Sequence, residues 1–238
     1  MTQIAQIHNL SLVRIASERL MSRTSGLPGM AVLYGPAGYG KTTAALALAN
    51  ENRSYFVQMR SAWGRKALLE KILEEMGAKT AGTIPQLLDQ VCEQLACSGR
   101  MLMIDEFDYC IRNDGLIELV RDIYEGSQST LLLLGEELLP QKLKRWERFH
   151  SRVLSWIPAQ PISRHDAEIL VPIYCPNVVV NRDLLDHLVK ISGGSVRRVS
   201  VNLAAICEAA AVEGWETVGR EQWGDRPLYT GDAPRRAA

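Results

Sequence analysis

The sequence predicts an α/β fold, in which a parallel five-stranded sheet is flanked by helices and followed by a small helical domain. Five short apolar segments of strand length alternate with helical patterns up to about residue 157, and this alternation is typical of a parallel sheet covered on both faces. Pro158 and Pro161 then mark a boundary. Beyond them only helical patterns remain, which predicts a separate helical domain.

The expected elements follow this order along the chain. Strands are expected at residues 30–34, 54–59, 100–106, 130–135 and 152–157. Helices are expected at 11–22, 43–49, 62–76, 84–96, 114–125 and 136–149, the last interrupted at Pro140, and then at 163–174, 182–191 and 195–212. The chain thus divides into an N-terminal helix (1–25), an α/β domain (26–160), a helical domain (161–213) and a C-terminal tail (214–238). The tail is rich in Gly, Pro and charge, so its order is left open.

Composition indicates an ordinary globular protein. The 238 residues are 47% hydrophobic and 23% charged, with zero formal net charge, so overall charge gives no argument for a nucleic-acid partner. The five cysteines form no C-x-x-C pair, which predicts free thiols rather than a disulfide framework or a zinc site. No apolar run reaches the roughly 18 residues of a membrane span, and the N-terminus lacks a signal pattern. We therefore expect a soluble cytoplasmic protein with no membrane partner.

A phosphate-binding motif follows the first expected strand. Residues 35–42 fit the pattern G-x-x-x-x-G-K-[ST], and a run of strong helix formers comes after them. In this strand, loop and helix context, backbone N–H groups and a helix N-terminus bind phosphate. The expected nucleotide-binding residues are Gly35, Pro36, Ala37, Gly38, Tyr39, Gly40, Lys41, Thr42 and Thr43. Lys41 would reach the β- and γ-phosphates of ATP, and Thr42 would offer its hydroxyl to Mg²⁺.

A pair of acids, Asp105 and Glu106, ends the third expected strand. Open parallel sheets bind ligands at the carboxyl ends of their strands. Asp105 is therefore expected to hold Mg²⁺, directly or through water, as part of the nucleotide site. Glu106 is expected to be the general base that polarises the attacking water. The alternative, two surface acids that open a loop, is disfavoured downstream of a complete phosphate motif.

The fourth expected strand should lie beside the strand that precedes the phosphate loop. The end of such a strand commonly carries a polar residue that senses the γ-phosphate. Here Gly135 and Glu136 stand at that end. The sensor therefore stays open between Glu136 and a neighbouring residue.

Two groups of arginines complete the candidate site. Residues 142–152 form a basic stretch that is either a solvated face, the usual reading of such a stretch, or the source of an arginine supplied in trans to a neighbouring subunit. Arg152 is the preferred arginine and Arg148 the second choice. Farther along, Ser195 is a plausible N-cap of the last long helix. Arg197 in its first turn opposes the helix dipole, which a nucleotide phosphate would offset.

These motifs together resemble those of the AAA+ ATPases. The matching parts are the P-loop at 35–42, Asp105 with Glu106, Ser151-Arg152, which is similar to the arginine-finger box, and Gly194-x-x-Arg197, which is similar to the second sensor of the lid. The resemblance implies a P-loop AAA+ domain followed by a helical lid, with ATP and Mg²⁺ as cofactors. Within this class the chain looks most like the compact MuB-like DNA transposition regulators of Mu-type phages and related transposons. The strings that suggest them are Gly-Glu-Glu-Leu-Leu at 135–139 and Gly-Gly-Ser-Val-Arg-Arg at 193–198.

The narrower resemblance implies an ATP-dependent protein that assembles into helical filaments on double-stranded DNA, captures target DNA and activates a transposase. It would act in the cytoplasm of a bacterial host if a phage encodes it. MuB itself carries an extra N-terminal helix-turn-helix domain, for which residues 1–25 are too few. The AAA+ core would therefore have to bind DNA itself.

The best candidate for DNA contact is the stretch at residues 60–66, with Arg60, Trp63, Arg65 and Lys66. Lys and Arg bind phosphates without sequence preference and with strong salt dependence. The alternative is that Trp63 belongs to the core while Arg65 and Lys66 form a solvated first turn. The sequence favours neither.

Two other functions stay open. A replication initiator or helicase loader of related build would be expected to carry a dedicated DNA-binding domain or a helicase-contact motif. A secretion-associated ATPase would be expected to carry a transmembrane or peptidoglycan-binding extension. A purely structural role is disfavoured, because a complete P-loop with two acids at a strand end has no structural purpose.

Overall fold

The computed structural model describes residues 5–231, which divide into two compact units. The α/β unit comprises Leu10–Pro36 and Lys41–Ala159. The helical unit comprises the described residues up to Asn9, the short segment Ala37–Gly40, and the described residues from Gln160 onward. Pro158 and Pro161 stand on either side of this division, and the four-part domain division expected from the sequence stays a prediction.

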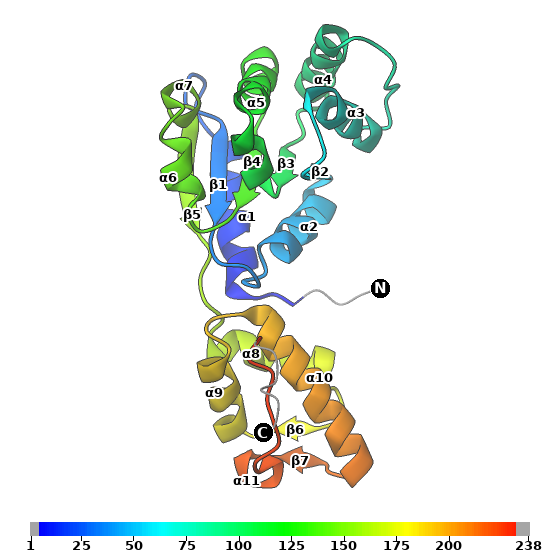
Figure 1. The fold of residues 1–238 in the computed structure, drawn as a ribbon, viewed down its shortest axis with the longest axis vertical. Coiled ribbons are helices and arrows are strands. Elements are labelled where there is room, and N and C mark those ends of the chain that lie inside the picture. The colour runs from blue at the N-terminus through cyan, green and yellow to red at the C-terminus, as the bar shows by residue number, and fades with distance from the viewer. Residues whose placement is uncertain (1–4, 232–238) are drawn as a thin grey trace, which may run out of the picture. The chain divides into compact units, whose positions relative to one another are not determined.

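The α/β unit is built on a five-stranded parallel sheet with the strand order β2-β3-β4-β1-β5 (Figure 1). The strands are β1 (Met30–Tyr34), β2 (Tyr55–Gln58), β3 (Leu102–Asp105), β4 (Leu131–Gly135) and β5 (Val153–Pro158). Residues of β1 pair with β4 on one side and with β5 on the other. Because all strands run the same way, their carboxyl ends share one edge of the sheet.

One helix precedes the first strand, and the others connect the strands. They are α1 (His8–Met21), α2 (Lys41–Asn52), α3 (Arg65–Glu75), α4 (Ile84–Ser98), the 3-10 helix η1 (Phe107–Arg112), α5 (Asp114–Ser127), α6 (Leu139–Leu143) and α7 (Glu147–His150). Between β2 and β3 the chain forms two helices, α3 and α4, which lie side by side (Figure 1).

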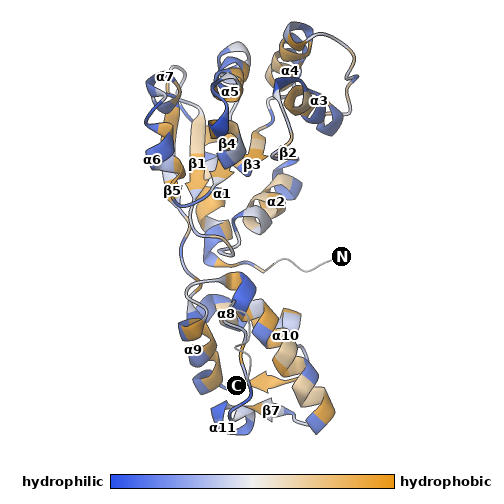
Figure 2. Cartoon of the chain, in the orientation of Figure 1, coloured by the Kyte–Doolittle hydropathy of each residue, from blue (hydrophilic) through white to orange (hydrophobic). Residues whose placement is uncertain are grey.

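The core of the α/β unit forms because its central strands are apolar throughout. Every residue of β3 and β4 is buried, as a strand covered on both faces requires. Figure 2 shows β1, β3 and β5 in hydrophobic colours, whereas α6 and α7 carry many hydrophilic side chains. Phe107 and Phe149 are fully buried and stack with their ring centroids 5.7 Å apart. This contact joins η1 to α7.

The helical unit contains α8 (Arg164–Tyr174), α9 (Arg182–Ile191), α10 (Val196–Glu213) and α11 (Arg220–Trp223). It also contains a two-stranded parallel sheet, β6 (Val179–Val180) and β7 (Thr217–Val218), so the expectation that only helices follow residue 161 was incomplete. Buried Asn202 on α10 bonds both the N–H and the carbonyl of Tyr229. Asn202 therefore holds the tail at Tyr229, and the tail residues beyond 231 lie outside the described part.

Several boundaries differ from those predicted. The helix expected at 136–149 is split into α6 and α7, and Pro140 stands in the first turn of α6, where its missing N–H costs nothing. The 3-10 helix η1 was not expected. α3 begins at Arg65, not at residue 62, with Gly64 as its N-cap. Within residues 5–231 every helix is too short or too polar to cross a membrane.

Candidate active site

The phosphate loop lies between the end of β1 and the start of α2. Gly38 and Gly40 have φ angles of +84° and +82°, a conformation that glycine adopts without strain. α2 begins at Lys41, so the N–H groups of its first turn, including those of Thr42 and Thr43, have no partner four residues earlier within the helix. The loop and helix start thus have the form of an anion site.

Lys41 is held at this loop by its own backbone neighbours. Its Nζ donates to the carbonyl oxygens of Gly35 at 2.6 Å and Pro36 at 2.9 Å. Burial lowers the pKa of Lys41, and the nearby carboxylates of Asp105 and Glu106 oppose that effect. The contact of the Lys41 ammonium with a nucleotide phosphate stays a prediction.

Thr42 and Asp105 offer oxygen ligands of the kind that Mg²⁺ prefers. The hydroxyl of Thr42 donates to Oδ2 of Asp105 at 2.8 Å. Asp105 is 2% exposed, and its Oδ1 accepts the N–H of Glu106 at 2.8 Å. Gln58 at the end of β2 donates from Nε2 to the same Oδ2 at 3.4 Å. These residues fit a magnesium-bound nucleotide. The structure brings together Thr42 and Asp105, which the sequence predicted separately.

Glu106 follows Asp105 in an unusual backbone conformation. Its φ and ψ are +54° and +40°, in the left-handed region that side chains other than glycine rarely adopt. Burial raises the pKa of Glu106, the charge of Asp105 raises it further, and Lys41 lowers it. Strained residues of this kind cluster at functional sites. Glu106 is close enough to Lys41 for their charges to interact, and its role as a general base stays a prediction.

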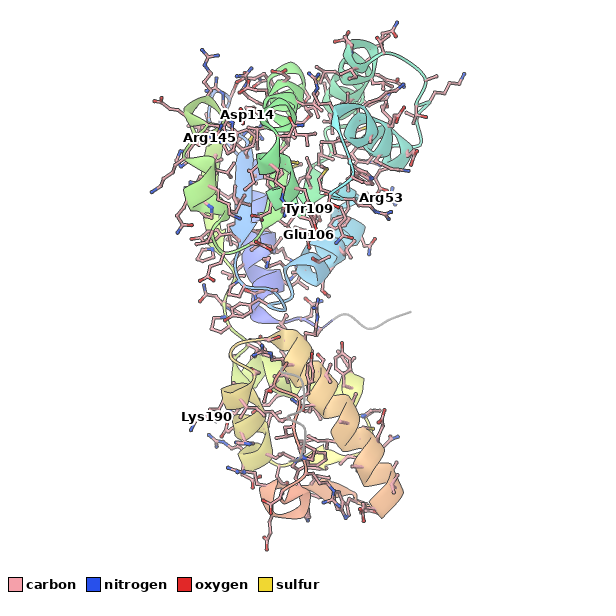
Figure 3. All side chains as sticks on the ribbon, in the orientation of Figure 1. Arg53, Glu106, Tyr109, Asp114, Arg145 and Lys190 are labelled. Carbon is pink, nitrogen blue, oxygen red and sulfur yellow. The ribbon has the colours of Figure 1, made fainter. Side chains whose placement is uncertain are left out.

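Next to Glu106 lies a cavity of about 400 Å³ at the carboxyl ends of β3 and β4. The labelled side chains of Glu106 and Tyr109 mark it in Figure 3. Its floor holds Asp108, which is 7% exposed. Oδ2 of Asp108 accepts the backbone N–H of Glu136 at 2.6 Å, and Oδ1 accepts Nζ of Lys142 at 2.8 Å. The candidate sensor Glu136 is thus bonded to Asp108 through its backbone, while its side chain is 69% exposed.

Arg152 stands at the opposite edge of the same sheet. Its carbonyl accepts the N–H of Met30, the first residue of β1, and the phosphate loop begins after the last residue of that strand. Five residues of strand span about 15 Å, so Arg152 lies far from its own chain's loop. Its Nε bonds Oε1 of Glu125 at 2.5 Å. Arg148 is exposed on α7.

Arg197 is the second residue of α10. Ser195 is the N-cap of this helix, as predicted, and its hydroxyl accepts the N–H of Arg198. Within the helical unit, the backbone N–H of Arg197 donates to the carbonyl of Gly38 at 3.2 Å. The role of the Arg197 side chain toward a phosphate stays a prediction.

The four candidate DNA contacts divide between two environments. Trp63 is half-buried and packs against the core, with the guanidinium of Arg60 5.7 Å from its ring centroid. Arg65 and Lys66 are exposed in the first turn of α3, and Lys66 lies 3.7 Å from Glu70. Trp63 therefore anchors the stretch to the core while Arg65 and Lys66 face solvent. The contact of this stretch with DNA stays a prediction.

Comparison with known proteins decides the family. The AAA domain family matches residues 24–143, half of the chain and the part that holds the phosphate loop, Asp105 and Glu106. The chain belongs to the AAA domain family. AAA domains bind nucleotide and act as ATPases, and the five-stranded parallel sheet flanked by helices is the fold predicted for such a domain.

Similar AAA proteins come from archaea. The replication factor C large subunit of Sulfolobus acidocaldarius is 23% identical over 181 residues. The match covers 74% of this chain but only 38% of the length of that relative. The ORC2 protein of Aeropyrum pernix, solved with ADPNP and ADP, superposes with a TM-score of 0.68 at 18% identity over 92% of this chain and 68% of that one. The ORC1 protein of the same organism, solved with DNA, gives 0.66 at 19% identity over 93% and 65%. These likenesses show the AAA fold.

Within this AAA domain, sequence reasoning missed Gln58 and Asp108. Gln58 pairs in register with Asp105, but strand order cannot be read from one sequence. Asp108 follows the predicted acid pair by two residues, in a stretch for which the sequence analysis predicts no element. Gly135 is the signal that could have pointed to Asp108. The end of this strand commonly carries a polar residue, and a glycine there indicates that the polar group comes from elsewhere in the chain.

Proposed function

We propose that this chain is an ATP- and Mg²⁺-dependent, DNA-binding AAA ATPase of the replication-initiator or loader type, which assembles with copies of itself when ATP is bound. The observation that carries the proposal is the hydrogen bond of 2.8 Å between Thr42 and Asp105 beside Lys41 and Glu106. This arrangement supplies phosphate contacts, a metal site and a base, which are the parts of a P-loop ATPase. Similarity to ORC proteins, one of them solved with DNA, supports the choice of partner.

In the proposed mechanism each residue has one task. The loop N–H groups and Lys41 bind and orient the phosphates. Thr42 and Asp105 would hold Mg²⁺, which neutralises phosphate charge when bound. Glu106 takes a proton from the water that attacks the γ-phosphate. Arg152 of a second copy would stabilise the charge that develops there.

The nucleotide site is tested by two substitutions with a matched control. Lys41→Ala should abolish ATP binding, and Glu106→Gln should bind ATP but hydrolyse it at least about a hundredfold more slowly. Lys144→Ala, which removes an exposed lysine of the same unit, should leave both properties unchanged. Binding is measured with a fluorescent ATP analogue and turnover by phosphate release. Normal ATP affinity in Lys41→Ala would contradict the site assignment.

DNA binding is tested by salt dependence. Arg65→Ala with Lys66→Ala should weaken binding of double-stranded DNA and lower the slope of log K against log salt by about 2, because each lost phosphate contact removes about 0.9. The control pair Arg182→Ala with Lys190→Ala removes two exposed cations of α9 and should leave the slope unchanged. Equal slopes for parent and test variant in fluorescence anisotropy would favour the alternative interpretation, in which residues 60–66 form a solvated face without DNA contacts.

A second candidate function is the regulation of DNA transposition. The strings at 135–139 and 193–198 favour it, and it predicts continuous ATP-dependent filaments on DNA of any sequence, together with stimulation of a transposase. Electron microscopy of the chain with double-stranded DNA and ATP, ADP or no nucleotide separates the two. Discrete oligomers support an initiator or loader, and long regular filaments support the transposition regulator.

A further inference from the structure

The carboxyl end of β4 has no polar side chain of its own, and the packing around it explains why. A Cβ atom added to Gly135 would stand 2.5 Å from Oδ2 of Asp108 and would also collide with Cδ2 of Leu139. Real side chains do not approach so closely, so one of the groups would have to move. A carboxylate from η1 therefore fills the space that a side chain on this strand end would take.

Asp108 is held there by two partners from different elements. Its oxygens accept the N–H of Glu136 at 2.6 Å and Nζ of Lys142 at 2.8 Å. The Asp108 side chain is 9% exposed. A buried carboxylate of this kind is stable only while it is paired and hydrogen-bonded. Asp108 thus ties together η1, the residue after β4, and α6.

We propose that Asp108, held by Lys142, is the polar group at the end of β4 that positions Glu106 for hydrolysis. Glu106 is the N-cap of η1 and Asp108 is the second residue of that helix. Anchoring Asp108 to the backbone of Glu136 fixes the turn from which Glu106 projects in its left-handed conformation. Both Asp108 and Lys142 are positioning residues, and the inference rests on the ATPase activity proposed above.

The hydrogen bond to Glu136 can be separated from the ion pair. Removing Lys142 alone would leave a buried charge without its partner and would destabilise the fold. Two double variants avoid this, because both remove the charge pair. Lys142→Met with Asp108→Asn keeps an oxygen that accepts the N–H of Glu136. Lys142→Met with Asp108→Ala removes that acceptor.

The readouts are kcat, KM, affinity for a fluorescent ATP analogue and melting temperature. The asparagine variant should keep kcat within about threefold of the parent, and the alanine variant should lose about tenfold, the effect of one hydrogen bond worth about 1.4 kcal/mol. Both should keep KM and analogue affinity within about threefold, because the phosphate contacts remain. Lys144→Met is the control for loss of a lysine, and Lys142→Arg, which keeps the charge, should retain kcat.

Equal kcat values in the two double variants would overturn the inference, as would an alanine variant whose loss lies in KM alone. If the alanine variant does not fold, Gly135→Ala gives a second test, because its methyl group would crowd both the Asp108 carboxylate and Leu139 while both partners of Asp108 remain. Parent-level kcat in a folded Gly135→Ala protein whose crystal structure shows the Asp108 carboxylate displaced also overturns it. A parent that hydrolyses ATP no faster than Glu106→Gln would instead contradict the proposed function.

Discussion

Replacing Arg152 with alanine should abolish ATP turnover while the fold stays intact. Arg152 bonds Glu125, but the two side chains are 43% and 40% exposed, so losing this ion pair should cost at most about 1 kcal/mol of unfolding free energy. That corresponds to a fall in melting temperature of about 4 °C or less. An arginine supplied in trans to a γ-phosphate contributes about 10³ to 10⁵ in kcat. Turnover should therefore fall at least about a thousandfold.

Mixing two inactive variants tests whether the arginine acts between subunits. Arg152→Ala keeps Glu106, and Glu106→Gln keeps Arg152. In a head-to-tail assembly formed from equal amounts of both, about one interface in four pairs an intact base with an intact arginine. Phosphate release from the mixture should therefore recover to about a quarter of the parent rate.

Two results would contradict an arginine that acts between subunits. One is turnover in Arg152→Ala that stays within a few fold of the parent. The other is a mixture that remains as inactive as its components although both proteins bind ATP and co-assemble by sedimentation. In the second case Arg148→Ala, on the preceding helix, becomes the variant to place in the same mixing experiment.

Three further predictions concern stability and reactivity. Phe149→Ala should lower the free energy of unfolding by about 3–5 kcal/mol in urea titration, because the ring is fully buried; a loss below about 1 kcal/mol would contradict this packing. Cys97 is exposed, whereas burial raises the pKa of the Cys110 thiol to about 12. At pH 8 a maleimide should therefore label Cys97 quickly and Cys110 only after unfolding, since the thiolate reacts; mass spectrometry reads the sites. Asn202→Ala should release the segment around Tyr229 to limited proteolysis, and an unchanged cleavage pattern would show that other contacts hold it.

Local patterns predicted the parts of the fold that depend on local chemistry. The apolar runs that became β1, β3 and β4 are recognisable because strands buried on both faces need no alternation. The phosphate loop was readable because its glycines and Lys41 stand at fixed spacing. Ser195 was readable as an N-cap because capping depends on the few residues that follow it.

What the sequence did not reveal depends on partners distant in the chain. Gln58 reaches Asp105 only because β2 and β3 are neighbours. The bond between Asp108 and Lys142 joins residues 34 positions apart, and no local pattern indicates it. The strands β6 and β7 are two residues each, too short for periodicity to detect. Trp63 could not be assigned because a half-buried aromatic satisfies both readings of its stretch.

The pairing of β1 with β5 fixes the distance between the start of the phosphate loop and the backbone of Arg152. One end of β1 leads directly into the phosphate loop, and the other end is bonded to the backbone of Arg152. In an assembly in which Arg152 of one copy reached the phosphate loop of the next, as proposed, the two contact points on each copy would be separated by the length of β1. A hydrogen-bonded sheet would fix that separation, and changes in loop length elsewhere would not alter it.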